Sequence, residues 1–246
     1  MKTDRVVVIT GAAGGMGEVL VDRFLANGDT VVATDTKDET LAKLHEKHGV
    51  DAKLVTVAAD ITKEDGCARV ADAARNKAGR VDVLVNCAGY FPFVTFENMT
   101  PDQWRQTIDI NLTGNFLMTH AMLPLMKSRG WGRIINYGSG SVFNGVEGQS
   151  HYVAAKAGII GLTRSLAREL GGYGITVNIA VPGVTMTEPV RRTFSPALIE
   201  KSRNARAIKR DELPEDLVGP VFFLASPDAD FMTGQMINVD GGNNMY

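Results

Sequence analysis

The sequence predicts an α/β fold: one doubly wound sheet of about seven parallel strands with helices on both faces. Short continuous runs of apolar, often β-branched residues recur along the 246-residue chain, as is typical of strands buried on both faces. Segments with helical periodicity separate most of these runs, and this alternation builds parallel sheets through right-handed crossovers. Because no linker, repeat or low-complexity stretch interrupts the pattern, we expect residues 1–246 to form a single domain.

We expect strands at residues 6–9, 31–34, 54–57, 81–85, 133–136, 175–181 and 236–239. The clearest helical segments cover residues 16–27, 62–78, 101–127 and 152–170. Residues 185–211 break the alternation after the sixth strand, where ligands bind in sheets of this kind. Long insertions at such a place are often lids, so we expect a substrate lid there. Its basic cluster, residues 203–210, is interpreted as a solvated or lid-like segment.

Composition excludes several classes of protein. A formal net charge of −2 argues against a nucleic-acid binder, which usually carries a strong basic excess. No apolar run reaches the roughly 18 residues that a membrane span needs, and we see no signal peptide. Two cysteines without a CxxC motif predict free thiols in a reducing compartment, so a cytoplasmic location is expected. No His/Cys/Asp cluster suggests a metal site.

The first strand runs into a glycine-rich turn that opens a helix. Gly11 allows a tight turn, and Gly15 and Gly17 let the backbone approach a pyrophosphate closely, with Met16 between them. The helix N-terminus then presents free N–H groups and a positive dipole end to the phosphates. The alternative is a glycine-rich turn without a ligand. A nucleoside-triphosphate loop is disfavoured because no Gly-Lys-Ser/Thr follows.

Further ligand-binding candidates lie at later strand ends. Asp35 lies 18 residues past Gly17, where an acid can bind the ribose 2′-hydroxyl of NAD and repel the 2′-phosphate of NADP. The nearby Lys37 is the reason to keep NADP open, and Asp35 could equally be a turn or N-cap residue. Strands three and four end in small or polar residues that are further cofactor candidates: Asp60, Ile61, Asn86, Ala88 and Gly89.

A catalytic constellation follows the fifth strand. Tyr152 and Lys156 are spaced i, i+4 on a predicted helix and therefore share one face. A phenol titrates near pH 10, and a neighbouring ammonium would lower the pKa of Tyr152 enough for proton exchange with a substrate. Ser139 could stabilise charge on the same substrate oxygen. A Tyr-x-x-x-Lys motif alone is uninformative, because many helices carry one.

Taken together, the motifs resemble the short-chain dehydrogenase/reductase family in its NAD(P)-binding form. The match adds the 13-residue gap between Ser139 and Tyr152, and the residues Asn111, Pro182, Gly183 and Thr187. The resemblance implies a Rossmann fold, Tyr152 as general acid/base, and Lys156 as its supporter and a ligand of the nicotinamide ribose.

The resemblance also implies roles for residues whose chemistry and position in the sequence alone do not indicate one. It implies that the main-chain carbonyl of Asn111 holds a water linked to Lys156. It also implies that Val184 and Thr187 hold the nicotinamide carboxamide, and that the protein is a homotetramer. The chain departs from the family pattern at Cys87, Tyr137 and Gly138.

Apolar and aromatic residues near Ser139 and Tyr152 favour a hydrophobic or aryl secondary alcohol, or its ketone, as substrate. The candidates for this pocket are Tyr90, Phe91, Phe93, Ser141, Phe143, His151, Met186 and Phe194. Ordinary packing is the alternative role for most of the aromatic ones. Two other functions stay open: a 3-oxoacyl-thioester reductase, which would favour NADPH, and a non-catalytic dinucleotide-binding regulator.

Overall fold

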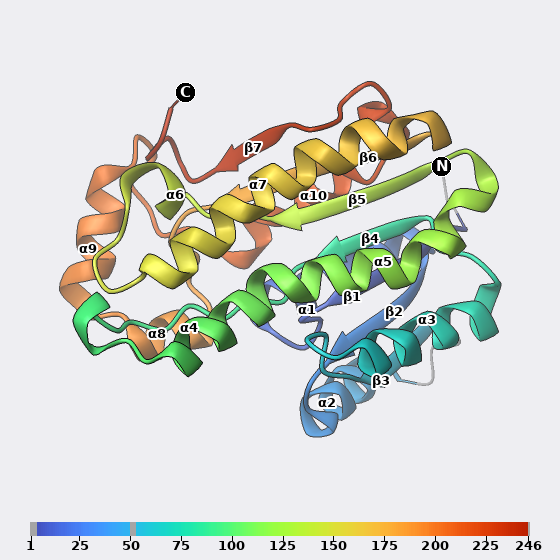
Figure 1. The fold of residues 1–246 in the computed structure, drawn as a ribbon, viewed down its shortest axis with the longest axis horizontal. Helices are drawn as coiled ribbons and strands as arrows, with labels where there is room; N and C mark the ends of the chain where they lie inside the picture. Colours follow the sequence, from blue (N-terminus) through green and yellow to red (C-terminus); the bar gives the residue numbers. More distant parts are fainter. Residues whose placement is uncertain (1–3, 50–52, 246) are drawn as a thin grey trace.

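A single parallel sheet organises the protein, whose computed structural model describes residues 4–49 and 53–245 (Figure 1). The strand order is β3-β2-β1-β4-β5-β6-β7, and every neighbouring pair is parallel. The sheet confirms the predicted fold class. Its strands are β1 (Val6–Thr10), β2 (Thr30–Asp35), β3 (Leu54–Ala58), β4 (Val83–Asn86), β5 (Gly132–Tyr137), β6 (Ile175–Pro182) and β7 (Met236–Val239).

Helices cover both faces of the sheet. One face carries α1 (Gly15–Asn27), α2 (Asp38–His48) and α10 (Pro214–Leu224), and the other carries α3 (Glu64–Ala78), α5 (Gly114–Met126) and α7 (Ser150–Leu170). Shorter helices lie toward the ends to which the strand arrows point: α4 (Pro101–Ile108), α6 (Ser141–Asn144), α8 (Glu188–Thr193) and α9 (Pro196–Ala205). Within the described ranges, no helix has the length and apolar character required to cross a membrane.

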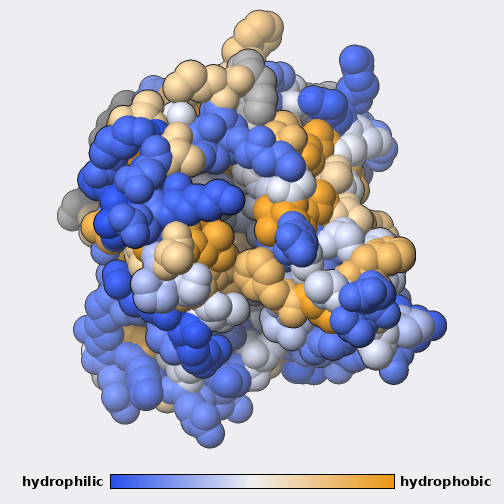
Figure 2. Space-filling view, turned by 90° about the vertical axis from the view of Figure 1, so that its left-hand side faces the viewer, coloured by the Kyte–Doolittle hydropathy of each residue, from blue (hydrophilic) through white to orange (hydrophobic). Residues whose placement is uncertain are grey.

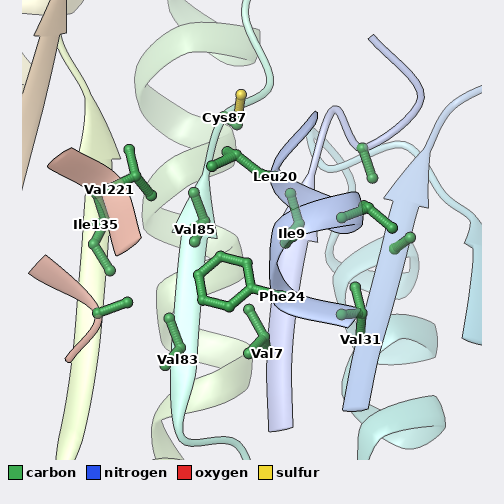
Figure 3. Close-up of a cluster of buried hydrophobic side chains, with 14 of the residues drawn as sticks. Val7, Ile9, Leu20, Phe24, Val31, Val83, Val85, Cys87, Ile135 and Val221 are labelled. Atoms are coloured by element: carbon green, nitrogen blue, oxygen red, sulfur yellow. The ribbon is translucent and has the colours of Figure 1, made fainter. Parts of the chain in front are cut away.

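Alternation along β1 shows how the two layers are held. Val7 and Ile9 pack with Phe24 of α1 in the core on one face (Figure 3), whereas Val8 belongs to the core on the other face. Successive side chains of a strand point to opposite faces, so a strand between two helical layers must be apolar at every position. This requirement explains why the strands read as continuous apolar runs in the sequence.

The segment predicted as one helix over 101–127 is interrupted. A capping box at Thr100 starts α4, and a π-helical segment, η2 (Asp109–Thr113), separates α4 from α5. Such a π-turn inserts extra backbone into a helix and is often found at functional sites. The helical periodicity of the sequence does not single out α2 and α10. The strand β4 begins two residues later than expected.

The predicted lid, residues 185–211, forms α8, α9 and a returning loop. Arg203 and Arg210 lie in the expected solvated run, paired with Asp211 and Asp216. A solvated position is wrong for Arg206, which is 3% exposed, whereas the lid-like alternative stays a prediction. The Arg206 guanidinium donates to the Val184 carbonyl at 2.7 Å and lies 3.5 Å from the Glu212 carboxylate. Burial of a charged group is tolerated when it is paired and hydrogen-bonded.

Glu212 fixes the loop that follows β6. Its carboxylate accepts the Gly183 N–H at 3.1 Å and the Thr185 hydroxyl at 2.6 Å, and only 5% of the residue is exposed. Burial raises the pKa of Glu212 to about 7, although the bonds from Thr185 and the Arg206 charge act in the opposite direction. The two ends of residues 185–211 are therefore held together by a carboxyl group whose pKa is raised to about 7.

We expect the Phe24→Ala variant to lose about 3–5 kcal/mol of unfolding free energy, because the ring is fully buried between sheet and helix (Figure 3). Urea unfolding would measure the loss. Phe96→Ala is the matched control, since 78% of Phe96 is exposed. Equal losses in the two variants would contradict this account of the core.

Glu212 should make stability depend on pH. Its pKa rises from an ordinary 4.5 to about 7 in the fold, so the native protein binds the proton more readily than the unfolded chain between these values. Stability from this group is therefore present at low pH and is lost as pH rises through this window. Glu212→Gln cannot titrate.

The test for Glu212 is chemical unfolding of both proteins from pH 4.5 to pH 8. The unfolding free energy of the wild type, minus that of Glu212→Gln, should fall as pH rises across the window. A difference that stays constant, or one that grows with pH, would contradict the raised pKa.

Candidate functional site

A cleft of about 690 Å³ runs along the carboxyl ends of the first strands. Its lining comes from the turn after β1, the ends of β2, β3 and β4, and the start of α7. The structure brings most of the sequence-predicted cofactor residues to this cleft: Gly11, Gly15, Met16, Gly17, Asp35, Asp60, Ile61, Ala88, Gly89, Tyr152, Lys156, Pro182 and Thr187. We name it the dinucleotide cleft.

The glycine turn leaves backbone exposed to this cleft. Gly11 has a φ of +64°, and a Cβ added there would lie 2.8 Å from the Cα of Ala88. A Cβ on Gly17 would lie 2.1 Å from the Gly11 carbonyl oxygen, so both positions require glycine. Gly14 caps α1 without a side-chain hydrogen bond, which leaves N–H groups of the first turn for a ligand. These features fit a bound pyrophosphate.

Carboxylates mark the far part of the dinucleotide cleft. Asp35 ends β2, and its carboxylate accepts the Ala13 N–H at 3.2 Å and the Thr36 N–H at 2.8 Å. These bonds hold Asp35 against the glycine turn, where it can also accept a ribose hydroxyl. Asp60 accepts the N–H and the hydroxyl of Thr62 at 2.9 and 2.8 Å, so it also stabilises the turn after β3.

A second cavity of about 250 Å³ continues from the cleft, and we name it the substrate pocket. Both share Met16, Phe91, Tyr152, Pro182 and Thr187 as lining. Figure 2 shows the side of the molecule toward which the strand arrows point, with hydrophobic residues gathered near its middle. Three of the predicted aromatic residues line the pocket in edge-to-face contact: Phe91 with Phe194 at 6.5 Å between ring centroids, and Phe93 with Phe194 at 5.4 Å.

Tyr152 lies where the two cavities meet. It belongs to the first turn of α7, and the Phe91 ring contacts it edge-on at 6.4 Å. Ser139 and Ser141, which also line the substrate pocket, have their hydroxyl oxygens 2.8 Å apart. The Ser141 N–H donates to the Ser139 oxygen at 3.2 Å and fixes the catalytic candidate Ser139.

Burial favours the neutral forms of Tyr152 and Lys156, which share one face of α7. It raises the pKa of Tyr152 to about 12, and a hydrogen bond with Ser139 partly opposes this. Burial also lowers the pKa of Lys156 to about 8. The Lys156 ammonium donates to the Tyr137 carbonyl at 2.9 Å. The expected lowering of the Tyr152 pKa is therefore wrong for the protein alone, because burial of the phenol is the largest effect and outweighs the hydrogen bond with Ser139.

Asn111 lies in the π-helical segment η2 and is fully buried. Its side chain donates to the Tyr90 carbonyl at 2.7 Å and to the Thr107 carbonyl at 2.9 Å, and accepts the Tyr90 N–H at 3.2 Å. The side chain thus fixes the loop after β4, a role that the sequence did not reveal. The water-holding role of its main-chain carbonyl stays a prediction.

Several predicted residues lie elsewhere. Asn86 is fully buried and donates to Asn136 of β5 at 2.9 Å, so it ties strands together and does not line the cleft. Gly183 and Val184 line the substrate pocket, whereas Tyr90 lines the dinucleotide cleft. Phe143, His151 and Met186 line neither cavity. His151 and Met186 are buried in the packing, because neighbours of a site residue point in other directions.

Sequence reasoning missed three polar residues near the substrate pocket: Glu212, Asn144 and Asn244. Glu212 anchors the pocket loop of Gly183 and Thr185, as described above. Asn144 and Asn244 line the pocket from α6 and from the segment after β7. No local motif identifies these residues, since the contact between them joins positions 100 apart in the chain.

Known proteins resemble the chain over nearly its whole length. The profile of a family described as enoyl-(acyl carrier protein) reductase matches residues 11–244. An acetoacetyl-CoA reductase of Rhizobium meliloti is 40% identical over 239 residues, which are 97% of this chain and 98% of that protein. A 2,3-dihydroxy-2,3-dihydro-p-cumate dehydrogenase of Pseudomonas putida is 39% identical over 98% of this chain and 95% of its own.

A solved structure shows the same fold. It is a short-chain dehydrogenase/reductase from Brucella melitensis, described as a glucose/ribitol dehydrogenase, with a TM-score of 0.94 and 31% identity. The match covers 99% of this chain and 98% of that one. This chain therefore belongs to the short-chain dehydrogenase/reductase family, whose members are oxidoreductases that use nicotinamide dinucleotide cofactors.

Proposed function

We propose that this protein is an NAD-dependent dehydrogenase that interconverts a hydrophobic or aryl secondary alcohol and its ketone. The observation that carries the proposal is the place of Tyr152, between the dinucleotide cleft and a substrate pocket with aromatic lining. A proton donor at this junction contacts the substrate oxygen while the substrate carbon faces the cofactor side. The arrangement suits removal or addition of two electrons at one carbon.

The residues that line the dinucleotide cleft are suited to hold the cofactor. The turn around Gly11 and the start of α1 would face the pyrophosphate, and Asp35 would bind the adenine ribose. Lys156 and Thr187 line the part of the cleft next to Tyr152. When bound there, the nicotinamide supplies the hydride acceptor for oxidation or the hydride donor for reduction.

Tyr152 and Ser139 have different roles at the substrate oxygen. A neutral Tyr152 phenol can donate its proton to the oxygen of a ketone that is being reduced. In oxidation, the Tyr152 oxygen takes the proton of the alcohol. The Ser139 hydroxyl, held by the Ser141 N–H, can donate to the substrate oxygen and stabilise its negative charge. Lys156, one helical turn along, brings positive charge when protonated.

Asp35 supports NAD over NADP. A carboxylate at the ribose would repel a 2′-phosphate, and Asp35 is held in place by two backbone N–H groups. Lys37, which kept NADP open, is the N-cap residue before α2 and is not among the residues that line the cleft. A preference for NAD favours alcohol oxidation as the working direction.

Reduction of a 3-oxoacyl thioester is the second candidate, and one relative named above is an acetoacetyl-CoA reductase. Two observations favour the alcohol. Asp35 opposes the NADPH that a reductase of this kind would prefer, and the substrate pocket of about 250 Å³ is lined by three phenylalanines. A non-catalytic regulator is disfavoured because Ser139, Tyr152 and Lys156 lie together at one site.

Tyr152→Phe should lower kcat for alcohol oxidation by roughly 10²–10⁴-fold, the usual contribution of a general acid/base, with NADH binding retained. Initial rates at 340 nm with NAD⁺ and a panel of aryl, alicyclic and polyol secondary alcohols would measure it. Tyr173→Phe, an exposed tyrosine outside both cavities, is the control. Unchanged turnover in Tyr152→Phe would overturn the proposed chemistry, and a protein that binds NADH but oxidises no alcohol would favour the regulator.

Asp35→Asn should raise the ratio of kcat/KM with NADP⁺ to kcat/KM with NAD⁺ by about 10- to 100-fold, because one negative charge near the 2′-phosphate is removed. The substitution keeps the size of the side chain. Asp38→Asn, a neighbouring exposed acid in the first turn of α2, is the control and should leave the ratio unchanged. An unchanged ratio in Asp35→Asn would remove the main argument for NAD.

A further inference from the structure

The lining of the substrate pocket combines an apolar part with a group of amides. Phe91, Phe93 and Phe194 supply aromatic surface. Asn144, at the end of α6, and Asn244, from the C-terminal segment, line the same pocket together with Ser139 and Ser141. Neither asparagine takes part in the chemistry proposed above, and an amide beside an apolar cavity fits a ligand with a polar group of its own.

A buried carboxylate holds the C-terminal segment over the catalytic loop. Asp240, 2% exposed, accepts the backbone N–H groups of Gly242, Asn243 and Asn244 at 3.0 to 3.1 Å. It also accepts the Asn244 side-chain amide at 2.8 Å. A Cβ added to Gly140 would lie 2.8 Å from the Asn244 Nδ2. Asn244 is therefore packed directly on the residue that follows Ser139.

The two amides are linked in an ordered chain. Asn144 donates from Nδ2 to the Asn244 Oδ1, and Asn244 donates from Nδ2 to Asp240. The direction of these bonds fixes which atom of each amide is nitrogen. An Asn side chain has two N–H groups and a carbonyl oxygen, so Asn144 keeps one N–H and its oxygen for a ligand.

This polar part of the pocket is suited to a neutral group. Arg206 is the one cation among the described lining residues. Its guanidinium is already committed to the carbonyls of Val184 and Arg210 and to Glu212. Amides and hydroxyls without a free positive charge recognise a hydroxyl better than a carboxylate or phosphate.

From this juxtaposition we infer that Asn144 is a specificity-determining residue, which binds a second hydroxyl next to the reacting carbon, and that Asn244 is a positioning residue, because its amide is already bonded to Asn144 and Asp240. The inference rests on the proposed function and narrows its substrate to a ring-bearing diol. Ser139 and Tyr152 take the reacting oxygen, Ser141 and Asn144 the neighbouring one, and the aromatic side chains the ring. The balanced reaction is diol + NAD⁺ → hydroxyketone + NADH + H⁺, in which Tyr152 takes the alcohol proton in its phenolate form and then releases it to solvent.

The experiment compares cis-1,2-indanediol with 1-indanol, which has the same ring and lacks the second hydroxyl. With NAD⁺, the kcat/KM of the wild type for the diol should be about tenfold higher than its kcat/KM for 1-indanol. This difference corresponds to the free energy of roughly one hydrogen bond. Asn144→Leu, nearly isosteric, should remove this preference by raising KM for the diol, so that the ratio of kcat/KM for the diol to kcat/KM for 1-indanol falls about tenfold. Asn244→Leu should act in the same direction, and Asn98→Leu, exposed and outside the pocket, should not.

The outcomes separate this inference from the proposed function. If the wild type oxidises 1-indanol and the diol with equal kcat/KM, the role of the amides is overturned and the proposed alcohol dehydrogenase activity is not affected. Equal losses for both substrates in Asn144→Leu would also overturn it, because a structural defect does not distinguish one hydroxyl from two. Failure of both indane substrates with a protein that binds NADH would overturn the proposed function and the diol with it.

Discussion

All seven strands run in one direction, and this constraint places every strand's carboxyl end at a single edge of the sheet (Figure 1). The strand order reverses between β1 and β4, so the chain leaves in opposite directions there and a crevice opens between the two halves. The Thr10 hydroxyl joins the two ends by accepting the N–H groups of Cys87 and Ala88, each at 3.1 Å. The glycine turn, Asp35 and Tyr152 therefore line one cleft, because each lies at or after the carboxyl end of a strand.

Burial decides the protonation of the site more strongly than the pairing of its residues. Desolvation penalises a charged phenol and a charged ammonium alike, which is why Tyr152 and Lys156 shift in opposite directions toward neutrality. A neutral phenol is a proton donor, whereas acceptance of an alcohol proton needs phenolate character, which Lys156 favours only while it is itself protonated. The charge beside Tyr152 therefore affects how much of the protein carries each protonation form of Tyr152.

The sequence allowed the sheet and most of the residues that line the dinucleotide cleft to be predicted, because these depend on local pattern. The group of Ser139, Tyr152 and Lys156 was predicted from the resemblance to the short-chain dehydrogenase/reductase family, since its local motif alone is uninformative. Strands buried on both faces must be apolar throughout, and a pyrophosphate site needs glycines at a strand end. Contacts between distant segments could not be predicted. Arg206 resembles its solvated neighbours, and its burial depends on Glu212 and on the Val184 carbonyl. The homotetramer stays a prediction, with the partly exposed Trp104 and Phe116 on α4 and α5 as side chains that such an assembly could bury.

Two buried carboxylates, Glu212 and Asp240, organise the parts of the pocket that the sheet does not. Each lies outside the catalytic group, and each accepts backbone N–H groups of a segment that lines the substrate pocket. Backbone that leaves a sheet has no ladder to satisfy its N–H groups, so an acceptor from elsewhere in the chain must fix it. The sheet thus places Tyr152 and the dinucleotide cleft, whereas contacts from these two carboxylates place the segments after β6 and β7 that line the substrate pocket.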